Sequence, residues 1–137
     1  MGSSPQKGNV VSVFGSNEPV AGDASYEDAR EIGRRLAKLG YTIANGGYGG
    51  VMEASSRGAS DAGGDTIGVV CSVWSPTANR YTDRTIETSS LLERLNKLIE
   101  LGTGGYVVLP GATGTLVELA TVWELSAKRL LQWRPIV

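Results

Sequence analysis

Three glycine-rich segments each follow directly on a short apolar run, and this arrangement constrains the fold more than any other feature of the chain. The segments are residues 15–17 (Gly-Ser-Asn), 45–50 (Asn-Gly-Gly-Tyr-Gly-Gly) and 110–115 (Pro-Gly-Ala-Thr-Gly-Thr). The preceding runs, at about 10–14, 42–44 and 105–109, are nearly continuously apolar. Such runs are typical of strands buried on both faces, as in a parallel sheet. The glycines then mark places where the backbone turns tightly or approaches a ligand.

Segments with helical periodicity alternate with these runs. We predict helices from an N-cap at Ser25 to a stop at Gly40, over residues 51–62, from Leu91 to about Ile99, and over residues 116–131. A further strand is predicted at 66–70, and residues 71–88 are predicted to form a functional loop with a short strand at 85–87. Strands that alternate with helices at this spacing favour parallel βαβ units with right-handed crossovers. The chain is therefore predicted to be a single α/β domain with a doubly wound parallel sheet.

The two ends of the chain carry separate expectations. Residues 1–9 are polar and are predicted to be a disordered leader, so the domain is expected to span residues 10–137. Residues 135–137 (Pro-Ile-Val) resemble the start of an edge strand. Because such a strand is normally followed by more chain, we expect either a fragment or a natural protein with a longer tail.

The amino-acid composition excludes several kinds of active site and several classes of partner. The chain has 137 residues, no histidine, one cysteine and a formal net charge of −1. Histidine-based nucleophile or metal sites and an internal disulfide are thus excluded, and no metal site or cofactor is expected. The near-neutral charge argues against a nucleic-acid partner or an anionic membrane. We see no signal peptide and no apolar run long enough to span a membrane, and we expect a reducing, cytoplasmic setting.

The segment at 110–115 is the strongest candidate for a binding site. It joins a predicted strand directly to a predicted helix, where unpaired backbone N–H groups and the helix dipole favour an anion. The alternative is a tight connection with Thr113 or Thr115 as a helix N-cap. No lysine follows Gly114, so this is not a Walker P-loop. The carboxyl ends of parallel strands share one edge of a sheet, so all three glycine-rich segments are expected to meet there.

Other side chains near this edge allow both a structural and a functional interpretation. Glu118 lies in the first turn or so of the last predicted helix, where it either complements the dipole or borders an anion pocket. Arg94 is either part of a solvated helix face or reaches a phosphate. Cys71 is interpreted as a buried structural residue. The three tryptophans are interpreted as core or interface residues rather than as platforms for base stacking.

Two of the glycine-rich segments resemble motifs of a known family. Residues 45–52 (NGGYGGVM) are similar to the GGGxxGLM segment of the Lonely Guy (LOG) family, and residues 110–118 (PGATGTLVE) to its PGGxGTxxE signature. The opening Val-Phe-Gly-Ser at 13–16 is also similar, and the order agrees from about residue 10 to residue 137. The resemblance implies a Rossmann-like fold and a homodimer. It also implies phosphoribohydrolase activity, which releases the free base from a nucleoside 5′-monophosphate such as AMP or a cytokinin ribotide.

The family also contains relatives that carry molybdenum cofactor or bind nucleotides without known turnover, so a non-catalytic carrier is the alternative function. If the chain is an enzyme, the resemblance assigns catalysis to Glu118 and to Arg94, whose spacing to Pro110 is one residue longer than in the family. The phosphate- and nucleotide-binding residues implied are Gly15, Ser16, Gly46, Gly47, Gly50, Gly111, Ala112, Thr113, Gly114 and Thr115. Ala112 and Asn45 replace glycines of the family motifs, and at Ala112 we expect crowding if the backbone needs a positive φ.

Overall fold

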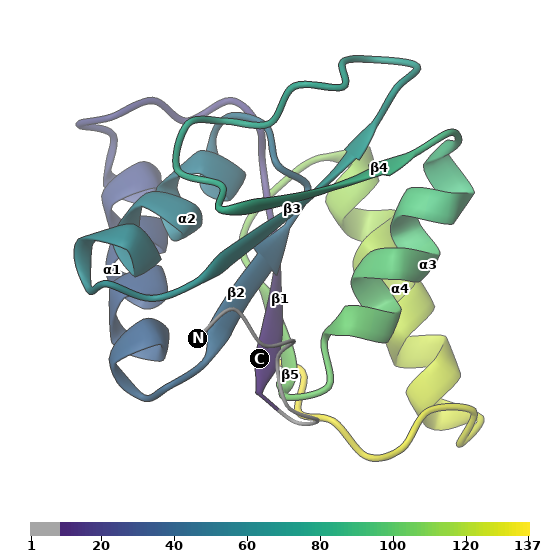
Figure 1. Ribbon diagram of the computed structural model, residues 1–137. Helices are drawn as coiled ribbons and strands as arrows, with labels where there is room; N and C mark the ends of the chain where they lie inside the picture. The colour runs from purple at the N-terminus through teal and green to yellow at the C-terminus, as the bar shows by residue number, and fades with distance from the viewer. Residues whose placement is uncertain (1–8) are drawn as a thin grey trace.

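The structure, a computed structural model, describes residues 9–137 and forms a five-stranded parallel sheet with helices on both faces (Figure 1). The sheet order is β4-β3-β2-β1-β5. The strands are β1 (Val10–Phe14), β2 (Thr42–Asn45), β3 (Thr66–Cys71), β4 (Arg84–Thr88) and β5 (Gly105–Val108). Helices α1 (Ala24–Lys38) and α2 (Val51–Asp61) cover one face, and α3 (Leu91–Leu101) and α4 (Thr113–Ala127) cover the other (Figure 1). The single α/β domain with a doubly wound parallel sheet is confirmed.

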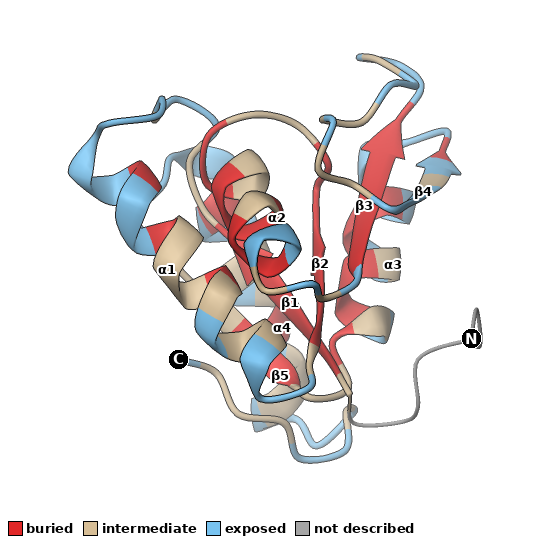
Figure 2. Cartoon of the chain, turned by 60° about the vertical axis from the view of Figure 1, so that its left-hand side comes forward, coloured by how far each residue is buried: buried red, intermediate tan, exposed pale blue. Residues whose placement is uncertain are grey.

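The sheet divides the hydrophobic core into two layers, and β1 contributes to both because its side chains alternate between the faces. Val10 and Phe14 pack with Leu98 and Tyr106 on the α3 side. Val11 and Val13 pack with residues of α1 and α2 on the opposite side. All residues of β1, β2 and β3 are buried, as Figure 2 shows in red. This double burial explains why the sequence of these strands is apolar without alternation.

The predicted leader at 1–9 lies outside the described residues, apart from Asn9. The carbonyl oxygen of Asn9 accepts a hydrogen bond from Thr42 N at 2.8 Å, so this residue, just before β1, is joined to β2. At the other end, the run predicted as an edge strand forms one parallel bridge, between Ile136 and Tyr106. Tyr106 N donates to Pro135 O at 2.9 Å and Val137 N donates to Tyr106 O at 2.9 Å, which places this segment beside β5.

The starts of two helices differ from the prediction. Helix α1 has its N-cap at Asp23 rather than Ser25, and it ends as predicted before Gly40, whose φ of 93° continues the chain in the left-handed region. Helix α4 covers 113–127 rather than 116–131, with Ala112 at the N-cap and no side-chain cap. Neither Thr113 nor Thr115 is therefore the N-cap, and Glu118 lies in the second turn of the helix rather than the first.

No helix within residues 9–137 combines the length and the apolar character that a membrane crossing requires.

Helices α1 and α2 approach closely because each carries a glycine at the contact. A Cβ atom added at Gly58 would overlap with Arg30 O, and one added at Gly33 would overlap with Ser55 O. Both neighbours are backbone atoms, which cannot move away as the end of a flexible side chain could. The two glycines thus set the distance between the helices.

We predict that Gly58→Ala lowers the free energy of unfolding by about 1–3 kcal/mol, because overpacking outweighs the gain in helix propensity. The matched control is Gly114→Ala, which also lies in a helix but has no heavy atom within 4 Å of the added Cβ. The control should unfold at the same urea concentration as the wild type or slightly above. Equal stability of the Gly58→Ala and wild-type proteins would contradict the close contact.

Candidate ligand-binding site

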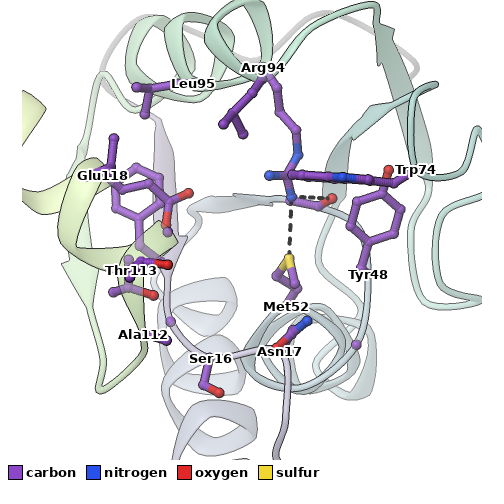
Figure 3. A pocket seen from close by; sticks show the side chains of 18 of the residues that line it. Ser16, Asn17, Tyr48, Met52, Trp74, Arg94, Leu95, Ala112, Thr113 and Glu118 are labelled. Atoms are coloured by element: carbon purple, nitrogen blue, oxygen red, sulfur yellow. Dashed lines mark hydrogen bonds between the residues drawn. The ribbon is translucent and has the colours of Figure 1, made fainter.

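A cavity of about 740 Å³ opens at the carboxyl ends of the central strands. It lies between the loops after β1 and β2, the segment that leads into α4, and the first turns of α3 (Figure 3). The predicted site residues in its wall are Gly15, Ser16, Gly46, Arg94, Ala112, Thr113, Gly114, Thr115 and Glu118. The sequence therefore predicted correctly that segments distant along the chain meet at this edge.

Three predicted site residues, Gly47, Gly50 and Gly111, are not part of the cavity wall. These three glycines form the turns that lie behind the cavity wall. Gly47 and Gly50 have φ of 80° and 64°, and a Cβ added at Gly50 would overlap with Ser16 O. A Cβ added at Gly111 would overlap with the Thr115 side chain. These residues shape the backbone that carries the wall.

Backbone hydrogen bonds join the three glycine-rich segments to one another. Ser16 N donates to Pro110 O at 3.1 Å, and Val51 N donates to Ser16 O at 2.8 Å. The loop after β1 is therefore held between the other two. The relative placement of the segments depends on main-chain contacts rather than on exposed side chains.

Asn45, which replaces a family glycine, holds the second glycine-rich segment in place. Its side chain is completely buried, and Nδ2 donates to Met52 O, Ser55 Oγ and Ser56 Oγ at 2.9, 3.1 and 2.8 Å. Its Oδ1 accepts from Gly47 N at 2.9 Å. The amide thus links the turn after β2 to the first residues of α2 through buried hydrogen bonds.

Ala112, the other departure from the family motif, is not strained. Its φ is −105°, a value open to any L-residue, so the positive φ on which the expected crowding depended does not occur. Gly114, one residue into α4, has open space where a Cβ would lie. The start of α4 thus presents backbone and small side chains to the cavity.

Arg94 points from α3 into the cavity floor and is not part of a solvated face (Figure 3). Nε donates to Val69 O at 2.7 Å, and Nη2 donates to Gly46 O at 2.9 Å and to Met52 Sδ at 3.6 Å. The guanidinium also lies 5.3 Å from the ring centroids of both Tyr48 and Trp74. Burial lowers the pKa of Arg94, and the negative charge of Glu118 opposes that effect.

Glu118 reaches the same cavity from α4 (Figure 3). Burial raises the pKa of its carboxyl from 4.5 to about 7, and the positive charge of Arg94 partly offsets this rise. A carboxyl with a pKa near neutrality can exchange a proton or carry a charge under ordinary conditions. Glu118 and Arg94 therefore provide opposite, partly desolvated charges in one cavity.

One wall of the cavity is aromatic, and no sequence pattern predicted it. Tyr48 and Trp74 both line it, with ring centroids 6.1 Å apart in an edge-to-face arrangement. Trp74 is thus neither a core residue nor shown to be an interface residue, and the only signal for it was its place in a loop predicted to be functional. Cys71 is buried, as expected. Within residues 9–137 no cluster of three or more acidic or thiol ligands could hold a metal ion.

The fold and the cavity together define a Rossmann-like protein with an open cavity at the carboxyl edge of its sheet, where proteins of this architecture bind ligands. The sequence model of the SLOG cluster4 family matches residues 9–131, and the chain belongs to this family.

Relatives of known name or structure agree with this assignment. The chain is 33% identical over 117 residues to a cytokinin riboside 5′-monophosphate phosphoribohydrolase of Mycobacterium tuberculosis, covering 83% of this chain and 62% of that protein. It matches an X-ray structure solved as a Northeast Structural Genomics Consortium target with a TM-score of 0.79 and 30% identity, over 93% of this chain and 72% of that one. A Moco carrier protein from Chlamydomonas reinhardtii matches with a TM-score of 0.76 and 26% identity, over 93% of this chain and 73% of that one. The fold is therefore shared by proteins named as enzymes and as carriers.

The raised pKa of Glu118 predicts a pH dependence of stability. The folded protein holds this proton more tightly than the unfolded chain, so the contribution is fully present below about pH 4.5 and is lost as pH rises through about 7. The loss amounts to at most about 3 kcal/mol. Urea unfolding of the wild type and of Glu118→Gln across pH 4.5–8 measures it, because the difference between the two proteins isolates this carboxyl.

The matched control is Glu124→Gln, an exposed position on the same helix paired with Lys128. Its difference from the wild type should not follow this profile. A flat difference between the wild type and Glu118→Gln would show that the Glu118 carboxyl is not desolvated.

Proposed function

We propose that the protein hydrolyses the N-glycosidic bond of a nucleoside 5′-monophosphate, such as AMP or a cytokinin ribotide, to a free base and ribose 5-phosphate. The observation that carries the proposal is the presence of Glu118, Arg94 and the start of α4 in the wall of one cavity. These groups have the chemistry needed for the three parts of the reaction: anchoring the phosphate, stabilising positive charge on the ribose, and holding the base.

The phosphate is proposed to bind at the start of α4. The first N–H groups of a helix have no partners within the helix, and the dipole places partial positive charge there. Ala112, Thr113 and Gly114 present little side-chain bulk to the cavity, so phosphate oxygens can approach the backbone. Anchoring the phosphate fixes the position of the ribose relative to the rest of the cavity.

Glu118 is proposed to act on the ribose. Water attacks C1′ as the bond from C1′ to the base nitrogen breaks, and the electron pair of that bond leaves with the base. The transition state carries positive charge on the sugar, which a carboxylate in a desolvated setting stabilises. The same carboxylate can take the proton of the attacking water and pass it on to the base nitrogen that leaves with the electron pair, because its pKa is near neutrality.

Arg94 is proposed to hold the substrate or the departing base. Nε and Nη2 of its guanidinium are held by the carbonyl oxygens of Val69 and Gly46. These two hydrogen bonds fix the direction of the Nη1 group. A lysine could not reproduce this arrangement, because it lacks the planar fork of donors.

The named relatives support both this activity and an alternative. The M. tuberculosis relative is named a phosphoribohydrolase, but this chain spans only 62% of it. The Chlamydomonas relative is named a Moco carrier, so the alternative is a carrier that binds a nucleotide or a pterin-type cofactor without turnover. Homodimerisation, implied by the family resemblance, and a cytoplasmic location remain part of the proposal.

We predict that Gly114→Val abolishes nucleotide binding in isothermal titration calorimetry with AMP. The added side chain would extend into open space at the cavity wall, where the phosphate is proposed to lie. Because no heavy atom lies within 4 Å of the added Cβ, the variant should fold and retain its thermal unfolding temperature within a few degrees. A folded Gly114→Val protein with unchanged affinity would refute the phosphate position.

We predict that the wild type releases base from at least one member of a panel of nucleoside monophosphates, and that Glu118→Gln reduces kcat by roughly 10²–10³-fold. Glutamine keeps the shape of the side chain but removes its charge, so affinity should change little while transition-state stabilisation is lost. Base release followed by chromatography, with affinities from calorimetry, measures both quantities. Glu124→Gln is the matched control and should keep full activity.

The pH profile separates the possible roles of the carboxyl. If ionised Glu118 is required, kcat/KM of the wild type rises with pH through about 7, and this limb is absent in Glu118→Gln. A falling limb would instead identify protonated Glu118 as a donor to the leaving base. Tight binding of nucleotides by the wild type without release of base from any of them would reject the enzyme in favour of the carrier.

A further inference from the structure

Trp74 combines exposure with a fixed position at the cavity wall. Its side chain is 58% exposed, yet it lines the cavity opposite Glu118 (Figure 3). Trp123 and Trp133 are also exposed, at 66% and 87%, but neither lines the cavity. Exposure alone therefore does not distinguish Trp74; its location does.

The loop that carries Trp74 is held by Tyr48. The Tyr48 hydroxyl accepts a hydrogen bond from Cys71 N at 2.8 Å and donates to Ser75 O at 2.8 Å, on either side of Trp74. Asn79 fastens the far end of the loop, with its N donating to Gly47 O at 2.7 Å and its Nδ2 donating to Tyr48 O at 2.9 Å. The backbone on both sides of Trp74 is thus tied to the turn after β2 while the indole stays exposed.

Two neighbours support the indole while leaving much of its surface open. The Tyr48 ring meets it edge to face, and the Arg94 guanidinium lies 5.3 Å from the indole centroid. A rigid aromatic surface of this kind binds another planar ring with little loss of side-chain entropy. It accepts any heterocycle with a π face, so it does not require a specific pattern of hydrogen bonds.

We propose that Trp74 is the stacking surface for the heterocycle of the ligand, and that it makes the protein selective for phosphorylated compounds that carry a planar nitrogen ring. This assignment rests on the proposed function for the phosphate at the start of α4. The cavity then has a phosphate end formed by backbone and an aromatic end formed by Trp74, with Glu118 and Arg94 beside the bond that joins sugar and base. Trp74 determines which ligands bind and takes no part in bond cleavage.

Calorimetry with two ligands tests the assignment. Relative to the wild type, Trp74→Ala should weaken AMP binding by about 5- to 150-fold, the range measured for loss of one base–aromatic stack. Binding of ribose 5-phosphate, which has no base, should stay the same. Trp74→Phe should recover part of the AMP affinity, and Trp123→Ala, outside the cavity, should bind both ligands as the wild type does. All titrations use the Glu118→Gln background, so that no AMP is consumed.

Fluorescence gives a second readout of the same contact. In a Trp123→Phe, Trp133→Phe protein, Trp74 is the remaining tryptophan. AMP should quench its emission, whereas ribose 5-phosphate should not. Quenching by both ligands, or equal weakening of both by Trp74→Ala, would overturn the proposal and leave Trp74 a structural role.

The outcomes separate this inference from the proposed hydrolysis. If wild-type protein releases no base but AMP binding depends on Trp74, the stacking assignment stands and the hydrolase fails. If base is released and Trp74→Ala binds AMP as tightly as the parent, the hydrolase stands and the stacking assignment fails. An absence of binding of every nucleoside monophosphate in the panel by the wild type and by the Glu118→Gln protein would overturn both.

Discussion

A single guanidinium group joins three segments that are far apart along the chain. Arg94, on α3, donates one hydrogen bond to Val69 O within β3 and another to the turn after β2. A side chain at Gly46 would overlap with this guanidinium, so the arginine and the glycine depend on each other. Loss of the arginine would leave two carbonyl oxygens without their donor, which is costly in a buried site. The Arg94 guanidinium therefore stabilises the fold as well as placing a positive charge at the cavity.

The sheet topology explains why this group lies where ligands can reach it. With β1 in the interior of the order β4-β3-β2-β1-β5, the connections after β1 and β2 lead to helices on one face, and that after β5 leads to the other. At this edge the strand ends lie between the two helical layers, and the cavity forms between those layers. Main-chain hydrogen bonds of Ser16 with Pro110 and with Val51 then fix the spacing of the loops that form the cavity.

The parts of the fold that depend on local pattern could be predicted from the sequence, and the parts that depend on distant contacts could not. Apolar runs such as 10–14 identified strands because burial on both faces leaves a direct mark on composition. The start of α4 was predicted too late because glycine and threonine at 113–115 resemble a turn, yet the first turn of a helix needs no internal N–H partners. Arg94 and Trp74 gave no local sign of their surroundings, since β3, Gly46 and Tyr48 create them in three dimensions.

One end of the cavity is formed mainly by backbone and the other by a side chain, and this difference has an evolutionary consequence. The end at α4 consists largely of main chain, which every substitution must preserve for the three glycine-rich segments to fit together. The opposite end is a side chain on a surface loop, attached through Tyr48 and Asn79. A change at that loop position leaves the sheet and its helices intact. Descendants of one ancestral scaffold could therefore diverge in the molecules they accept at little cost in folding stability.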